Sequence, residues 1–357
     1  MRIYLDNIIF FLQKSGGISV YWYELERRAL ATHDDLTVVE PGDRHNNIFR
    51  KQLNIPEEVI VSESRLWQKW LRYSALSITL PERAIVHSSY YRISTRRNAV
   101  NIVTVHDFTY ERFRSGPAKW IHTLQKRRAI RYADGIICIS ENTKRDLLKF
   151  FPDMQGKKIK VIYNGVSDLF RPGTGTDLSA GDPPYILYVG DRKAPYKNFA
   201  IAVDVLNRLK GYHLFIVGSV LSQEETSLLS DRLGGRYRHY ANISSEALND
   251  LYSRAFCLLY PSSYEGFGIP VVEAMKAGCP VVAANRSSIP EVAGEAALLV
   301  DSIVPESFLE AIRLLEEDET RKACIAKGIT QAEKFSWDQC FQETMAFYND
   351  VFWGELQ

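Results

Sequence analysis

The 357-residue chain lacks several features that define other classes of protein. No apolar run approaches the ~18 residues that span a bilayer, and Met1-Arg2-Ile3-Tyr4 leads directly into a strand-like stretch, so neither a membrane span nor a secretory signal is expected. The five cysteines are scattered, with no Cys-x-x-Cys pair. Most lie in apolar runs, which predicts buried free thiols of a cytoplasmic protein rather than disulfides or a zinc site.

Two short motifs that hold phosphates in other proteins are also missing. Asp-x-Asp occurs nowhere, so a metal ion that bridges phosphate groups has no support in the sequence. Gly-x-Gly-x-x-Gly is absent too, and its absence weighs against a nicotinamide dehydrogenase. We therefore expect neither a metal nor a cofactor.

Charge is distributed unevenly along the chain. The total is +1, but residues 1–165 carry +10 and the remainder carries −9. A basic first half predicts contact with something anionic, and an anionic lipid surface and a phosphorylated acceptor both fit. The sequence pI near 7.6 argues against a dedicated nucleic-acid binder.

Short runs of β-branched and aromatic residues alternate with helical patterns, which is typical of parallel α/β sheets. The expected strands are 3–5, 36–39, 84–86, 101–105, 135–139, 185–189, 213–217, 256–259, 280–283 and 297–300. Expected helices include 119–132, 141–151, 198–210 and 244–254.

The length predicts slightly more than two domains at ~150 residues each. A stretch rich in Gly, Pro, Ser and Thr over residues 168–184 is the best candidate linker. The expected organisation is therefore α/β, with a doubly wound domain over residues 1–165 and a second over 166–335. A C-terminal helix within 336–357 is expected to pack back on the first domain.

The most specific motif runs from Tyr264 to Gly278 and contains Glu265-Gly266-Phe267-Gly268-Ile269-Pro270, with Glu273 eight positions after Glu265. It follows an expected strand and opens a helix. The glycines let the backbone approach a ligand, and the helix N-terminus offers free N–H groups. Glu273 is expected on the first helical turn, facing the same ligand as Glu265. A plain strand-to-helix turn with two solvated glutamates is the alternative, and the two acids around Gly-Phe-Gly-Ile-Pro favour a ligand site.

This motif, continued by Cys279-Pro280-Val281-Val282-Ala283-Ala284 and by residues 287–294, resembles the retaining glycosyltransferases of family 4. The resemblance extends over nearly the whole chain. It implies the GT-B architecture, in which two Rossmann-like domains face a central cleft. Glu265 and Glu273 match the two acids of the family's Glu-x7-Glu motif, which implies that Glu265 contacts the donor sugar and Glu273 the nucleotide ribose. Gly266, Phe267, Gly268 and Ile269 then belong to the donor-binding loop.

A second element, residues 190–198, follows the expected strand 185–189 at the end where open α/β sheets bind ligands. Arg192 and Lys197 match the family's phosphate-binding cations. The resemblance implies that they hold the pyrophosphate and that, together with a helix dipole, they replace a metal. Lys193 matches less clearly and is expected to be a solvated surface charge.

Two elements of the first domain complete the implied site. Gly16 and Gly17 open a helix, and in the family this loop approaches the donor phosphate; a simple turn is the alternative. His106 and Asp107 end the strand 101–105, and the resemblance implies that they adjoin the reacting sugar, with Asp107 orienting His106. The same strand-end position makes Ser140 and residues 87–91 further candidates.

Residues 65–73 carry tryptophans and basic residues at helical spacing. Leu66, Trp67, Trp70 and Leu71 share one helical face, beside Arg65, Lys69 and Arg72. A core helix with a solvated basic rim is one interpretation. A membrane-surface helix is the other, favoured by the basic first half and by Lys126, Arg127, Arg128 and Arg131.

Together these features predict a metal-independent retaining transferase that moves a hexosyl group from a nucleotide sugar to a saccharide or polyprenyl-phosphate-linked acceptor. Resemblance to bacterial mannosyltransferases of surface-polysaccharide assembly implies GDP-mannose as donor. A UDP-sugar donor and a non-catalytic saccharide-binding protein remain alternatives. The expected location is the cytoplasm, at the inner face of the cell membrane.

Overall fold

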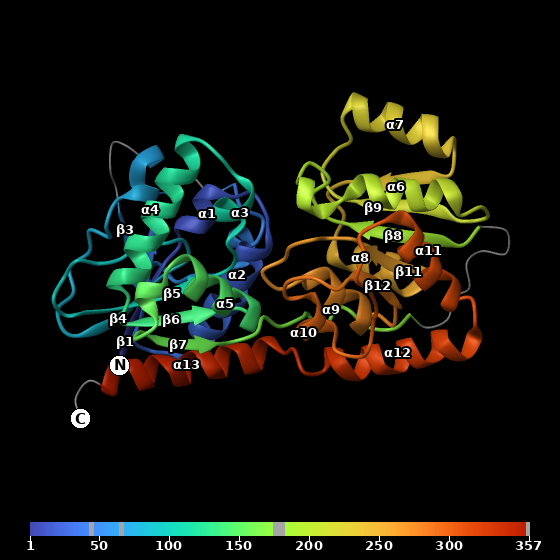
Figure 1. Ribbon diagram of the computed structural model, residues 1–357. Helices are drawn as coiled ribbons and strands as arrows, with labels where there is room; N and C mark the ends of the chain where they lie inside the picture. Colours follow the sequence, from blue (N-terminus) through green and yellow to red (C-terminus); the bar gives the residue numbers. More distant parts are fainter. Residues whose placement is uncertain (43–45, 64–67, 174–182, 355–357) are drawn as a thin grey trace. The chain divides into compact units, whose positions relative to one another are not determined.

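The computed structural model describes residues 1–42, 46–63, 68–173 and 183–354, with the backbone alone described at 68–70. These residues form two compact units, each built around its own parallel sheet (Figure 1). Unit 1 comprises Met1–Gly165 together with Trp337–Gln357, and unit 2 comprises Val166–Ser336. The chain thus leaves unit 1 at residue 165 and returns to it at residue 337.

Unit 1 has a parallel sheet whose strands lie in the order β3-β2-β1-β4-β5-β6-β7. The strands are β1 (Arg2–Asp6), β2 (Leu36–Glu40), β3 (Ile60–Ser62), β4 (Ala84–Ser88), β5 (Ala99–Val105), β6 (Gly135–Cys138) and β7 (Lys158–Val161). The helices are α1 (Ile8–Leu12), α2 (Gly17–Thr32), α3 (Thr109–Phe113), α4 (Pro117–Tyr132), α5 (Glu141–Phe150) and α13 (Trp337–Trp353). Every residue of β4 and β6 is buried, as expected of strands covered on both faces.

Helix α13, red in Figure 1, belongs to the core of unit 1 although it lies at the other end of the sequence. Its buried side chains pack with those of β1, β4, β5 and α2, and include Trp337, Cys340, Phe347, Tyr348, Val351 and Phe352. The hydroxyl of Tyr348 lies 2.5 Å from Nδ1 of His87 on β4. The helix therefore supplies part of the hydrophobic interior of a unit whose sheet is built from residues 2–161.

Unit 2 repeats the plan with the strand order β10-β9-β8-β11-β12-β13. The strands are β8 (Tyr185–Val189), β9 (His213–Val217), β10 (Tyr237–Tyr240), β11 (Cys257–Tyr260), β12 (Val281–Ala284) and β13 (Leu298–Val300). The helices are α6 (Phe199–Arg208), α7 (Gln223–Leu233), α8 (Ser245–Arg254), α9 (Ile269–Lys276), α10 (Ile289–Ala293), α11 (Pro305–Leu314) and α12 (Asp318–Ala332).

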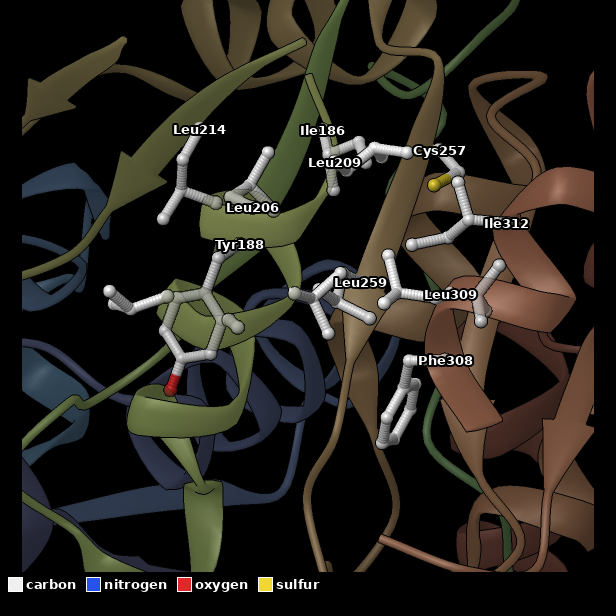
Figure 2. Close-up of a cluster of buried hydrophobic side chains, with 14 of the residues drawn as sticks. Ile186, Tyr188, Leu206, Leu209, Leu214, Cys257, Leu259, Phe308, Leu309 and Ile312 are labelled. Atoms are coloured by element: carbon white, nitrogen blue, oxygen red, sulfur yellow. The ribbon is translucent and has the colours of Figure 1, made fainter. Parts of the chain in front are cut away.

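The hydrophobic core of unit 2 lies between its sheet and the helices that cover it. Figure 2 shows part of that core, where strand residues such as Ile186 and Leu259 meet Leu206 of α6 and Phe308 of α11. All of these side chains are buried. Their burial fixes the strands whose carboxyl ends carry the polar residues described below.

Both sheets have the Rossmann-like order, in which the chain direction across the sheet reverses between two neighbouring strands. The reversal lies between β1 and β4 in unit 1 and between β8 and β11 in unit 2. Ligands of such sheets bind beyond the carboxyl ends of the strands at this position. The predicted α/β class with two doubly wound domains is confirmed.

All ten expected strands are present, and the four expected helices correspond to α4, α5, α6 and α8. Three further strands, β3, β7 and β10, were not expected, and each lies at an edge of its sheet. The five cysteines are buried free thiols, as predicted. Within the proposed linker, residues 174–182 lie outside the described part of the chain.

Candidate active site

Lys197 and Glu265 meet at the point in unit 2 where the strand order reverses. Lys197 lies in the loop after β8, and Glu265 lies in the loop after the neighbouring strand β11. Lys197 Nζ is 2.5 Å from Glu265 Oε1, and the same oxygen accepts a hydrogen bond of 2.7 Å from the Tyr260 hydroxyl. Both charged side chains are largely but not fully buried. The structure therefore brings two of the predicted donor-site residues together in one ion pair.

The loop that carries Lys197 passes close to the end of β9. A Cβ atom on Gly218 would lie 2.7 Å from the carbonyl oxygen of Gly190 and 2.9 Å from Nη1 of Arg192. No side chain fits at that distance from a backbone oxygen, so Gly218 is required for the approach of the two loops. Asn198 then takes a left-handed conformation, with φ of 51°, and starts α6.

The loop that carries Glu265 is held by two serines of the segment before α10. Ser287 Oγ accepts a hydrogen bond from the Glu265 backbone N–H, and Ser288 Oγ donates to the carbonyls of Glu265 and Phe267. These bonds explain why the Ser-Ser-Ile-Pro segment accompanies the Glu265 motif. They fix the backbone of Glu265 before any ligand binds.

Gly268 turns the chain from this loop into α9. Its φ of 101° lies in the region that favours glycine, and Ile269 begins the helix. No side chain caps this helix start, so backbone N–H groups of its first turn stay available to an anion. Gly266 and Ile269 are half-buried beside it, whereas Phe267 is buried and packs edge-on against Phe335. Phe267 thus anchors the loop from inside the unit.

Glu273 does not lie on the first turn of α9, contrary to expectation. The helix begins at Ile269, so Glu273 is its fifth residue and lies one turn further along. The Tyr252 hydroxyl on α8 donates a hydrogen bond of 3.1 Å to Glu273 Oε2. Burial raises the pKa of the Glu273 carboxyl to about 7. The two acids of the motif are therefore held by different partners, Glu265 by Lys197 and Tyr260, and Glu273 by Tyr252.

Arg192 and Lys197 are held by different carboxylates. The Arg192 side chain is fully buried, and its Nε lies 2.8 Å from Oε1 of Glu225 on α7. Its Nη2 donates to the carbonyl of Ser219 at 2.6 Å, after β9. Its Nη1 is buried beside Gly218 and has no hydrogen-bond partner among the residues that the structure describes. The guanidinium thus presents one unsatisfied donor near the Gly190–Gly218 contact, while exposed Lys193 is the surface charge that was predicted.

Gly16 and Gly17 lie at the N-terminus of α2 in unit 1. Gly16 is the residue before the helix, Gly17 is its first residue, and both are exposed. No side chain caps the start of this 16-residue helix. Its N-terminal N–H groups are therefore free to bind an anion, as at α9.

His106 follows β5 and is buried against aromatic residues. Its ring packs edge-on against Tyr21, with the ring centroids 5.1 Å apart. Burial lowers the pKa of His106 to about 4, so the imidazole is neutral near pH 7. Asp107 Oδ1 accepts a hydrogen bond from the backbone N–H of Thr109 at the start of α3. The Asp107 side chain therefore shapes the turn after His106.

The position of the His106 loop depends on a buried ion pair that the sequence did not reveal. Lys126 Nζ lies 2.8 Å from Glu111 Oε2 and 2.8 Å from the carbonyl oxygen of Asp107. Burial raises the pKa of Glu111, but the neighbouring His122 ring and the charge and hydrogen bond of Lys126 outweigh it, and the pKa is lowered to about 2. Because Lys126 is buried, it does not belong to the basic surface that it was expected to form with Arg127, Arg128 and Arg131.

The lower-ranked candidates of unit 1 have structural partners. Ser140 is the N-cap of α5 and accepts a hydrogen bond from the Thr143 backbone. His87 is buried between Thr104 and Tyr348, and burial lowers its pKa to about 3. Ser88 donates to Asp6, which forms an ion pair with the buried Arg92. These contacts make the 87–91 segment part of the scaffold at the carboxyl ends of β1 and β4.

The expected helix over residues 65–73 is described only in part. Arg65, Leu66 and Trp67 lie outside the described residues, and the rest forms a single 3-10 turn, Gln68–Tyr73. Leu71 is buried, and the Arg72 guanidinium lies over the rings of Tyr73 and Tyr90. In the described residues, no helix is long and apolar enough to cross a membrane, and no three acidic, His or Cys side chains are grouped to hold a metal ion.

Two family models match successive parts of the chain. Glycosyltransferase Family 4 matches residues 15–168, and Glycosyl transferases group 1 matches residues 176–331. The solved structure of sucrose-phosphate synthase from Thermosynechococcus elongatus superposes with a TM-score of 0.76 over 99% of both chains at 19% identity, which shows a common fold. The chain thus carries a Glycosyltransferase Family 4 domain followed by a Glycosyl transferases group 1 domain, and it is a glycosyltransferase with the GT-B fold.

Two curated relatives are mannosyltransferases by name. O-antigen chain mannosyltransferase B of Escherichia coli is 40% identical over 115 residues, which cover 32% of this chain and 30% of that protein. O-antigen chain mannosyltransferase RfbU of Salmonella typhimurium is 27% identical over 267 residues, which cover 71% of this chain and 70% of that protein. The first match therefore spans less than a third of its relative.

Proposed function

We propose that this enzyme transfers mannose from GDP-mannose, with retention of anomeric configuration, to a saccharide or lipid-linked saccharide in surface-polysaccharide assembly. Unit 2 binds the donor and unit 1 the acceptor, at the cytoplasmic face of the membrane. The observation that carries the proposal is the Lys197–Glu265 pair at the β8/β11 switch point, beside the uncapped start of α9. The names of the O-antigen mannosyltransferase relatives support the choice of mannose.

The donor pyrophosphate needs positive charge, and unit 2 offers three sources of it. Lys197 Nζ, the buried unsatisfied Nη1 of Arg192 and the N–H groups at the start of α9 all arise from loops at the carboxyl ends of the strands. Charge-assisted hydrogen bonds are about twice as strong as neutral ones. Because these groups are fixed before the donor binds, they stabilise the departing diphosphate without a metal ion.

Glu265 and Glu273 take different parts in this proposal. Glu265, held between Lys197 and Tyr260, contacts the hexose. Glu273 accepts hydrogen bonds from the ribose hydroxyls. Gly16 and Gly17 present the start of α2 to the donor phosphate, and the neutral imidazole of His106 contacts the reacting sugar. These four contacts follow the family pattern, and the uncapped start of α2 supports the contact with the donor phosphate.

Retention follows from displacement on one face of the sugar. The bond between the anomeric carbon and the phosphate oxygen breaks as the acceptor oxygen bonds to that carbon on the same face. The acceptor proton passes to the departing phosphate oxygen, so the nucleoside diphosphate leaves with it. No protein nucleophile is required, and Glu265 acts by stabilising positive charge on the sugar ring.

A donor panel tests the proposal directly. The full chain is incubated with GDP-mannose or with UDP-sugars, with and without an oligosaccharide acceptor, and release of the nucleoside diphosphate is measured. We expect acceptor-dependent release of GDP, and loss of that release in Lys197→Ala. Release of UDP alone would show that the donor is a UDP-sugar and not GDP-mannose. Nucleotide binding without turnover would favour a non-catalytic saccharide-binding protein.

A further inference from the structure

The solvent-facing side of α4 in unit 1 is apolar over its first half. Trp120, Ile121 and Leu124 are 68%, 50% and 63% exposed. Tyr132 at the end of the same helix is exposed as well, whereas every other described helix carries at most one exposed large hydrophobic side chain. A solvent-facing helix surface is normally polar, so the apolar side chains of α4 need an explanation.

Helical spacing places these residues on one face. Trp120, Leu124 and Arg128 follow one another at intervals of four, and Ile121 precedes Leu124 by three. The opposite face is the buried one and carries His122, Lys126, Ala129 and Ile130. The exposed apolar residues are therefore a continuous strip and not scattered surface positions. We call Trp120, Ile121, Leu124 and Arg128 the α4 strip.

The second half of the exposed face is cationic. Helix α4 contains no acidic residue, and Arg127, Arg128 and Arg131 are exposed. Arg127 Nη2 lies 3.2 Å from Asp153 Oδ2, and the charge of Arg131 also acts on Asp153. Arg128 forms no salt bridge with any described residue. Bulky apolar side chains next to a cluster of arginines that share one carboxylate suit a surface that is apolar and anionic at once.

A cavity of about 370 Å³ adjoins the strip. Ile121, Leu124 and Arg128 of the strip belong to its α4 wall, and Tyr73 and Ile93 line it from other segments of unit 1. The apolar surface of the strip thus continues inward instead of ending at the helix. A flat protein partner would leave this cavity unfilled, whereas lipid chains or headgroups adapt to it.

We propose that the α4 strip docks the enzyme on a membrane surface that contains anionic lipids. Trp120, Ile121 and Leu124 enter the interface between headgroups and acyl chains, and Arg128 and Arg131 contact the headgroup phosphates. This inference rests on the proposed function. Docking at a membrane would bring the enzyme to a lipid-linked acceptor. It also moves the membrane contact from residues 65–73 to α4.

Vesicle flotation of the full chain tests the proposal. The probes are vesicles of phosphatidylcholine alone and of phosphatidylcholine with phosphatidylglycerol, at low and at raised salt. We expect binding to the anionic vesicles that weakens as salt rises. Trp120→Ser/Leu124→Ser is expected to abolish binding. Arg128→Glu/Arg131→Glu is expected to weaken it by at least about twentyfold, since each lost arginine alone accounts for about fivefold.

Matched variants separate this strip from other exposed positions of unit 1. Trp353→Ser removes another exposed tryptophan, from α13, and Arg145→Glu reverses an exposed charge on α5. Both are expected to bind vesicles like wild type. All variants are expected to keep the wild-type melting temperature and the wild-type rate of nucleotide release with a soluble acceptor, so that loss of docking is distinguished from loss of the proposed activity.

Three results would overturn the proposal. The first is a wild-type chain that does not float with anionic vesicles at low salt. The second is loss of binding in Lys69→Glu/Arg72→Glu with binding intact in the α4 variants, which would return the contact to residues 65–73. The third is a change in oligomeric state of the Trp120→Ser/Leu124→Ser variant with vesicle binding unchanged, which would make the strip a contact between protein chains.

Discussion

The Glu265 carboxylate is held by two neighbours in the candidate site. One of its oxygens accepts hydrogen bonds from both Lys197 and Tyr260, so the carboxylate and the lysine position each other. We expect Glu265→Gln to lower kcat by about 100-fold or more, because fixed electrostatic groups of this kind contribute that much. We expect the affinity for free nucleotide to change little, because Glu265 contacts the sugar in the proposed complex.

Steady-state kinetics and calorimetry with GDP measure the two quantities. Tyr260→Phe is the matched control, since it removes one hydrogen bond to Glu265 and leaves the charge, and a smaller loss of kcat is expected. The role assignment would be contradicted if Glu265→Gln lost nucleotide affinity as severely as Glu273→Ala.

Glu273 makes stability depend on pH. Burial raises its pKa from 4.5 to about 7, so the folded chain binds the proton more tightly than the unfolded chain does. The protonated carboxyl therefore favours the fold at low pH, and that contribution is lost as pH rises through about 7. We expect Glu273→Gln to gain on the order of 1–3 kcal/mol over wild type between about pH 5 and pH 8.

Urea denaturation of both proteins across this pH range measures the difference in the free energy of unfolding. A difference that does not change with pH would show that Glu273 is already ionised in the folded protein. In that case water would keep the half-buried carboxylate ionised beside Tyr252.

A substitution at Lys126 tests how much the buried ion pair with Glu111 stabilises unit 1. The variant Lys126→Met leaves Glu111 buried without its cation and removes the bond to the Asp107 carbonyl. Loss of one partner of a buried pair costs about 3–5 kcal/mol. Chemical denaturation is expected to show this loss, and Lys126→Met/Glu111→Gln is expected to recover part of it. Equal stability of the single and double variants would mean that Glu111 does not need the lysine.

The residues that sequence reasoning missed are mostly long-range partners. Glu225, Tyr252 and Tyr260 hold Arg192, Glu273 and Glu265, and no local spacing links Arg192 to Glu225 across 33 positions. The motif residues themselves stand out because glycine, proline and acids cluster within a few positions. Partners supplied by other elements become visible only when the fold brings them together.

At the scale of elements, the interior of each sheet was predictable and its edges were not. Interior strands such as β4 and β6 are buried on both faces, and each contains a run of apolar residues, Ala-Ile-Val in β4 and Ile-Ile-Cys in β6. The strands that were missed, β7 and β10, have the sequences Lys-Ile-Lys-Val and Tyr-Arg-His-Tyr. Both are edge strands, which carry charged side chains and therefore lack a continuous apolar run. Hydrophobic periodicity therefore identifies the core of a Rossmann-like domain better than its boundary.

The start of α9 and the loop after β8 are the basis for predicting that turnover needs no metal ion. Both present donors to the same region of unit 2, through uncapped backbone N–H groups and through Lys197 and Arg192. We expect turnover with GDP-mannose to continue in EDTA at the uninhibited rate. Complete loss on chelation, followed by recovery with Mg²⁺ or Mn²⁺, would require a cation in the site.

At the scale of the whole molecule, the return of the chain to unit 1 changes its charge. Residues 1–165 carry +10, but residues 337–357 add four carboxylates and no base, which lowers the net charge of unit 1 to +6. The charge division therefore persists in weaker form. It follows that local clusters, such as the arginines of α4, matter more for binding an anionic surface than the total charge does.

The same return of the chain predicts which half of the molecule folds alone. Unit 2 is a single segment, Val166–Ser336, with its own closed core. Unit 1 draws six buried core residues from α13, including Trp337, Phe347 and Tyr348. Loss of one large buried aromatic side chain costs about 3–5 kcal/mol, and domains are stable by only about 5–15 kcal/mol. A fragment of residues 1–165 should therefore fail to fold cooperatively.

We expect the fragment 166–336 to melt in one transition and to bind GDP, because the proposed nucleotide contacts of Arg192, Lys197, Glu273 and the start of α9 lie within it. The fragment 1–165 is expected to show no cooperative transition until a peptide of residues 337–357 is added. Calorimetry of each fragment, with and without the peptide, measures both results. Cooperative melting of the fragment 1–165 alone would mean that unit 1 is stable without α13. Rescue of that fragment by a peptide with Phe347→Ala and Tyr348→Ala would mean that these two buried side chains are not needed to complete the core.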